Sequence, residues 1–62
     1  MLKKIDLVDG ANYRLFAIQD NVAFELKGEW VENEDGFNFH DPIAKINGFA
    51  KFEDFKQVLA MQ

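Results

Sequence analysis

Residues 22–31 alternate between apolar and polar side chains, and this alternation constrains the fold of the chain more than any other feature. Every second residue is apolar or glycine, whereas most of the residues between them are charged. A period of two places the two sets on opposite faces of a β-strand, so we expect one face to contact a core and the other to contact water. The core-facing set is Val22, Phe24, Leu26, Gly28 and Trp30. Gly28 interrupts this set, which indicates either a bulge or the close approach of another backbone.

Turn residues on both sides of this strand predict its neighbours. Asp20-Asn21 forms a two-residue turn after residues 12–19, a run that is apolar on both faces, as is typical of a central strand. Residues 32–36 form the following turn, in which Gly36 can take a positive φ, and residues 37–40 return as a short strand. Residues 2–8, which end at Asp9-Gly10, are predicted to form the first strand.

The segment over residues 41–48 allows two interpretations. Asp41-Pro42 followed by apolar residues is typical of a short helix with an aspartate N-cap. Asn47-Gly48 between Ile46 and Phe49 is equally typical of a type I′ hairpin turn. Because a single helical turn is marginal in water, we expect an irregular loop that ends in the hairpin turn.

The C-terminal residues predict the only long helix. Apolar residues recur there at helical spacing, and Glu53 and Asp54 occupy the first turn, where they favour the helix dipole. The apolar set is Phe52, Phe55, Val58 and Leu59. We therefore expect a helix over residues 52–61 that packs this set on the sheet.

These elements predict one domain over residues 1–62 of the α+β class, a four-stranded antiparallel meander packed on one C-terminal helix. The alternative is a small SH3-like β-barrel of five strands with a terminal helix, in which Asn47-Gly48 forms the last hairpin.

The residue types that the chain lacks exclude much chemistry. It contains no Cys, Ser or Thr, which excludes disulfides, thiolate and hydroxyl nucleophiles and cysteine zinc sites. His40, the only imidazole, could act with Asp41 or Glu25 as a general base or metal ligand. We favour a solvent-facing strand residue instead, because so short a chain rarely encloses a substrate pocket after filling a core. We predict no enzymatic activity, no cofactor and no metal.

No apolar run approaches the roughly 18 residues that span a bilayer, and the first residues lack the apolar stretch of a signal peptide. We therefore expect a soluble protein with no membrane partner and, by default, a cytoplasmic location. The abundance of Phe, Asn, Lys and Ile beside a single Arg is typical of AT-rich genomes, and small acidic proteins of this kind are frequent in phages and mobile elements.

Negative charge is concentrated in one segment. The chain has a net charge of −4, yet residues 25–41 hold six carboxylates against Lys27. A shared acidic surface would attract a basic protein and repel nucleic acid, so we predict an interaction module, acting as an inhibitor or accessory factor, that binds a basic partner. The competing interpretation is a turn that only maintains solubility. The predicted partner-binding residues are Glu25, Glu29, Val31, Glu32, Glu34 and Asp35.

The aromatic residues predict a core rather than a platform for stacking bases, because nucleic-acid platforms are flanked by Lys and Arg. This set is Phe24, Trp30, Phe37, Phe39, Phe52 and Phe55. The second apolar face of residues 12–19 suggests an alternative function, a homo-oligomeric structural domain, because a homodimer would cover that face. The predicted self-association residues are Tyr13, Phe16 and Ile18.

Overall fold

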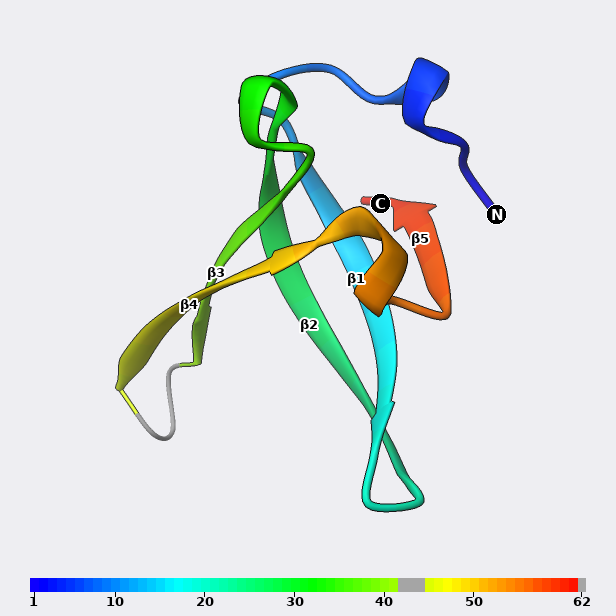
Figure 1. Cartoon of the computed structure of the whole chain (residues 1–62), viewed down its shortest axis with the longest axis vertical. Coiled ribbons are helices and arrows are strands. Elements are labelled where there is room, and N and C mark those ends of the chain that lie inside the picture. The colour runs from blue at the N-terminus through cyan, green and yellow to red at the C-terminus, as the bar shows by residue number, and fades with distance from the viewer. Residues whose placement is uncertain (42–44, 62) are drawn as a thin grey trace.

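The part of the chain that the structure describes forms one five-stranded antiparallel sheet with the strand order β4-β3-β2-β1-β5 (Figure 1). The computed structural model describes residues 1–41 and 45–61, without the side chains of Asp41 and Ile46. The strands are β1 (Asn12–Gln19), β2 (Val22–Val31), β3 (Gly36–Asp41), β4 (Ile46–Lys51) and β5 (Gln57–Ala60). Three short 3-10 turns accompany them, namely η1 (Lys4–Asp6), η2 (Glu32–Glu34) and η3 (Phe52–Asp54). No helix in the described ranges has the length and apolar character needed to cross a membrane.

The long β1–β2 hairpin confirms the strands predicted over residues 12–19 and 22–31. Its pairing runs without interruption from Gln19↔Val22 to Asn12↔Glu29. Asp20 and Asn21 have φ values of 52° and 64°, and positive φ at both positions gives a two-residue turn whose twist matches that of the strands.

The prediction of a strand over residues 2–8 is wrong. This segment contains η1 and pairs with no strand among the described residues. Several hydrogen bonds hold it. Lys3 N donates to Asp6 Oδ2 at 2.9 Å, Val8 N donates to the Tyr13 hydroxyl at 2.8 Å, and Leu2 N donates to the Val58 carbonyl oxygen at 2.9 Å. The tight turn leaves Ile5 90% exposed while Leu7 is buried, so the segment contributes one core side chain instead of a strand.

The predicted C-terminal helix, and with it the α+β class, is also wrong, because the described residues contain no α-helix. Residues 52–54 form the single 3-10 turn η3, and β5 then pairs with β1 from Phe16↔Gln57 to Tyr13↔Ala60. The physical reason is that a helix would leave the backbone N–H and C=O groups on one side of β1 without partners. Strand β5 pairs with those groups. Phe55 and Val58, whose spacing is typical of a helix, are still buried.

The alternative fold fails at two points, although the sheet does have five strands. The described residues include no terminal helix, and Asn47 and Gly48 lie inside β4, where they pair with His40 and Phe39. Residues 42–44, which belong to the predicted loop over residues 41–48, lie outside the described residues.

The core is centred on Phe37, which is fully buried together with Leu15 and Val58. The ring of Phe37 lies 5.0 Å from that of Trp30 and 5.6 Å from that of Phe55, measured between centroids. Of the six aromatic residues predicted for the core, these three are buried and the others are half-buried, namely Phe24, Phe39 and Phe52. In Figure 1, β4 and η3 cross in front of β1 and β2, so the returning chain covers the inner face of the sheet.

Two glycines set the close contacts of β2 and β3. A Cβ on Gly28 would lie 2.5 Å from Leu15 Cδ1, so the glycine marks a close approach and the uninterrupted register shows no bulge. The positive φ in the turn after β2 belongs to Asp35, at 58°, and not to Gly36. Glycine is required at position 36 because there is no room for a side chain: a Cβ there would lie 2.5 Å from the Ala50 carbonyl oxygen.

Candidate acidic interface

Four carboxylates gather around η2 and the adjoining end of β2. Glu29 is exposed on β2, and Glu32 and Glu34 are exposed on η2. Asp9 joins them because Glu32 N donates a hydrogen bond of 2.9 Å to Asp9 Oδ1. We call Asp9, Glu29, Glu32 and Glu34 the acidic end. Among the described residues, none of the four forms an ion pair.

Two of the predicted partner-binding residues are instead neutralised within the chain. Lys4 Nζ donates to Asp35 Oδ2 at 2.8 Å, and Arg14 Nε donates to Glu25 Oε2 at 3.1 Å. These pairs are solvent-exposed, where an ion pair contributes little to stability. They nevertheless cancel charge locally, so Asp35 and Glu25 attract a distant cation less than the acidic end does.

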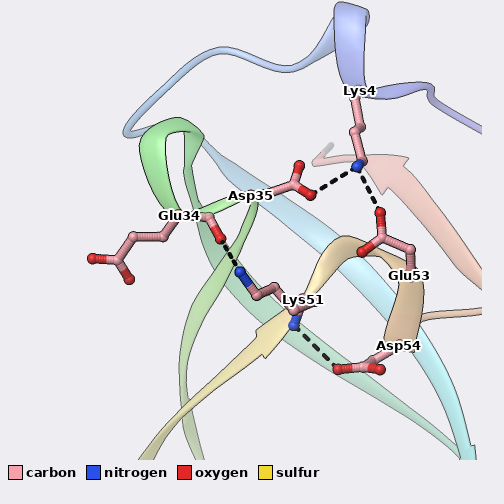
Figure 2. A network of polar contacts seen from close by, with 6 residues as sticks. All are labelled: Lys4, Glu34, Asp35, Lys51, Glu53 and Asp54. Atoms are coloured by element: carbon pink, nitrogen blue, oxygen red, sulfur yellow. Dashed lines mark hydrogen bonds and ion pairs between the residues drawn. The ribbon is translucent and has the colours of Figure 1, made fainter.

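Lys4, which lies in η1, also connects the N-terminal segment to η3 and to the residue that follows η2. Its Nζ lies 2.6 Å from Glu53 Oε2 in η3 as well as beside Asp35, which follows η2 (Figure 2). The hydrogen bond to Asp35, followed by that to Glu53, raises the pKa of Lys4 above its usual value. The hydrogen bond from Lys4 lowers the pKa of Glu53 below its usual value.

Lys51 fixes the base of η2 without neutralising its carboxylates. Its Nζ donates to the Glu34 carbonyl oxygen at 2.9 Å, and its backbone N donates to Asp54 Oδ2 at 3.2 Å. The Glu34 carboxylate points away from this network (Figure 2). Val31 is half-buried on the same face of β2 as Glu29, where it offers an apolar contact beside the carboxylates.

Asp9 is a member of the acidic end that the sequence does not predict. Asp9-Gly10 is typical of a turn after a strand, and 23 positions separate Asp9 from its hydrogen-bond partner Glu32. No local pattern signals this contact, since it depends on where η1 and the following turn leave the chain.

The structure separates the three predicted self-association residues. Tyr13 is buried on the core face of β1, where its hydroxyl accepts the hydrogen bond from Val8. Phe16 and Ile18 lie on the opposite face. Phe16 is half-buried with the Arg14 guanidinium 5.5 Å from its ring centroid, and Ile18 is 55% exposed. Only Phe16 and Ile18 are therefore available to a second copy.

His40 is exposed on β3, with Nδ1 2.7 Å from Asn47 Oδ1 on β4. In the part of the chain that the structure describes, no three His, Asp or Glu residues are grouped so that they could hold a metal ion.

Comparison of the chain with protein-family models, with curated proteins and with solved structures finds no match. Function is therefore inferred from the geometry of the molecule itself.

Proposed function

We propose that the protein is a small interaction module that binds a basic protein surface through the acidic end and acts as an inhibitor or accessory factor of that partner. The observation that carries the proposal is the gathering of four carboxylates on one end of the molecule, with no ion pair to a described cation. Unneutralised charge of one sign accelerates encounter with an oppositely charged surface and disfavours binding to nucleic acid.

The anchors of the proposed interface are Glu29, Glu32 and Glu34, with Asp9 beside them and Val31 as an apolar contact. Glu25 and Asp35 contribute less, because Arg14 and Lys4 already bind them. A basic partner must displace Lys4 and Arg14 before it can pair with Asp35 and Glu25. At the three anchors it has to displace only water.

The experiment compares the wild-type chain with a triple variant, Glu29→Gln, Glu32→Gln and Glu34→Gln. A partner is first captured from a lysate of the source cell, and its affinity for purified protein is then measured at low and high salt. We expect the triple variant to bind roughly tenfold or more weakly at low salt, and we expect wild-type binding to weaken as salt rises.

A second triple variant controls for net charge. Asp6→Asn, Asp20→Asn and Asp54→Asn remove the same number of charges away from the acidic end, and an amide oxygen can still accept the backbone hydrogen bonds that Asp6 and Asp54 receive. This control should bind like the wild type. Equal weakening by both variants, or affinity that ignores salt, would remove the proposal.

Self-association is the second candidate function, favoured by apolar exposure at the end of the β1–β2 hairpin. Ile18 is 55% exposed and Val22 is 62% exposed, and the hairpin extends beyond the other strands (Figure 1). Burying Ile18 together with Phe16, which lies on the same face of β1, in a homodimer would also stabilise so short a chain. Sedimentation over a wide concentration range tests this candidate, since a strict monomer eliminates it.

A further inference from the structure

Strand β2 has an unpaired edge over about half of its length. Strand β1 pairs with β2 over residues 22–29, from Asn12↔Glu29 to Gln19↔Val22 at the hairpin turn. Strand β3 pairs with β2 only from Val31↔Gly36 to Gly28↔Phe39, after which the two strands diverge. In the described part of the chain, residues 22–27 therefore have a neighbouring strand on one side only (Figure 1).

The backbone groups that face this open edge can be assigned. Trp30 N donates to Ala11 O at 2.9 Å, and Trp30 O accepts from Gly10 N at 2.8 Å, so the polar groups of Trp30 point towards the β1 side. Along an antiparallel strand, successive residues direct their N–H and C=O groups alternately to the two sides. The N–H and C=O groups of Ala23, Glu25 and Lys27 therefore point to the open edge, where no described strand pairs with them.

Two grooves adjoin this edge, one on each face of the sheet. The outer groove, of about 760 Å³, is lined by apolar atoms and by a larger number of polar residues than the inner groove, among them Glu25, Lys27, Glu29, Asn38, His40 and Asn47. The inner groove, of about 390 Å³, is lined mainly by apolar side chains, among them Ala17, Phe24, Ala50 and Phe55. Leu26 of β2 and Phe39 of β3 line both grooves, which places the grooves on the two sides of one gap between β2 and the β3–β4 hairpin.

We infer that this gap binds an extended peptide segment of a partner, which adds to β2 as a further strand. Free N–H and C=O groups on a sheet edge supply the hydrogen bonds of strand addition, and alternate side chains of the added strand enter opposite faces. The segment would direct apolar side chains into the inner groove and polar side chains into the outer groove. The carboxylates of Glu25 and Glu29 and the ammonium of Lys27 line the outer groove. Because Arg14 neutralises Glu25 and Lys27 balances Glu29, the outer side chains of the segment should be uncharged.

The space beside β2 is suited to a single segment rather than to the sheet of a second copy. Residues of β3 and β4 line both grooves, so the β3–β4 hairpin stands beside the open edge. If the β2 edge of a second protomer paired here, the β1 strand and the β3–β4 hairpin of that protomer would have to enter the gap as well, and the gap is already bounded by the β3–β4 hairpin of the first protomer. The inference does not depend on the proposed function, since it rests on backbone groups and an apolar groove, and Glu29 is the one member of the acidic end that lines either groove.

The test uses a synthetic peptide that alternates valine with threonine. Its length of about seven residues lies within the usual range for a β-strand. Amide hydrogen exchange of the full chain is followed by NMR with and without the peptide. In the free protein, the amides of Ala23, Glu25 and Lys27 should exchange faster than those of Phe24 and Leu26, which face β1. Peptide addition should slow exchange at those three amides specifically.

A matched pair of variants isolates the backbone contribution. Lys27→Pro and Lys27→Gln both remove the charge, but only proline removes the N–H that points to the open edge. That N–H takes no part in the β1 ladder, so the proline variant should retain the fold, as its NMR spectrum will show. We expect Lys27→Pro to bind the peptide roughly tenfold more weakly than Lys27→Gln, the effect of one lost hydrogen bond.

Control peptides and protein concentration define the results that overturn the inference. A peptide of the same composition with its valines grouped together, or one that is N-methylated on alternate residues, should leave exchange unchanged. Equal protection by these controls, slow exchange of the three amides in the free monomer, or protection that grows with protein concentration alone would each refute binding of a partner segment. A double variant, Glu32→Gln and Glu34→Gln, distinguishes the two proposals, because neither residue lines a groove. Its binding of the uncharged peptide should persist even if the acidic end binds nothing.

Discussion

Gly28 is the residue at which the packing of three strands depends on the absence of a side chain. A Cβ there would lie 2.5 Å from Leu15 Cδ1 on β1 and 3.2 Å from Phe37 Cβ on β3. Leu15 and Phe37 are both fully buried, so neither can move aside without displacing other core atoms.

We therefore expect Gly28→Ala to lower the free energy of unfolding by about 1–3 kcal/mol, the usual cost of overpacking a core. Urea denaturation followed by the fluorescence of Trp30, the only tryptophan, measures this change. Ala23→Gly, a reciprocal exchange at an exposed site of the same strand, should cost no more than about 1 kcal/mol. An unchanged midpoint for Gly28→Ala would show that the inner face of β2 has space for a methyl group.

At the scale of elements, local pattern predicts the β1–β2 hairpin but not the ends of the chain. Alternation and the Asp20-Asn21 turn specify both strands, because the pairs that join β1 to β2 all lie within the same 20 residues of sequence. Strand β5 has only four residues and depends on pairing with β1, from Phe16↔Gln57 onwards. Such a non-local partner leaves no periodic signal, whereas Phe52, Phe55 and Val58 happen to follow helical spacing.

The candidate site is predictable to a similar extent. The excess of carboxylates in residues 25–41 is a property of the sequence, and the exposure of Glu29, Glu32 and Glu34 follows from alternation and turn position. Neutralisation is not predictable, because Lys4 and Asp35 are separated by 31 positions and Arg14 and Glu25 by 11. Their pairing depends on how η1 and the β1–β2 register place them in space.

The contact between η1 and η3 should make stability depend on pH at both extremes. Lys4 lowers the pKa of Glu53, so the stabilisation is complete above the usual glutamate range and is lost as pH falls through the lowered pKa. The pKa of Lys4 is raised, so its stabilisation is complete below the usual lysine range and is lost as pH rises through the raised pKa.

Thermal denaturation across acid and alkaline pH tests this dependence. The difference in Tm between the wild type and Glu53→Gln should be largest near neutral pH and should shrink on acidification. Lys4→Gln should behave in the same way on alkalisation. Because both side chains are solvent-exposed, added salt should also reduce these differences. Differences in Tm that are constant across pH would mean that the ion pair does not form in solution.

At the scale of the whole molecule, the small core determines whether the chain folds at all. A domain of 62 residues has a free energy of unfolding of about 3–9 kcal/mol by the usual value per residue. The described residues hold seven buried hydrophobic side chains, and four other aromatic rings surround Phe37, those of Tyr13, Trp30, Phe52 and Phe55. Stability is therefore concentrated in few contacts, and one ring takes part in most of them.

Phe37→Ala should for this reason unfold the protein or bring it to the edge of unfolding. Replacing a buried Phe by Ala costs about 3–5 kcal/mol, which is comparable with the whole free energy of unfolding expected for a domain of this size. Circular dichroism during urea titration measures the loss. Phe49→Ala is the matched control, because Phe49 is 40% exposed on β4, and it should cost less than about 1 kcal/mol. A cooperative transition at the wild-type midpoint for Phe37→Ala would mean that the ring cluster around Phe37 does not hold the sheet together.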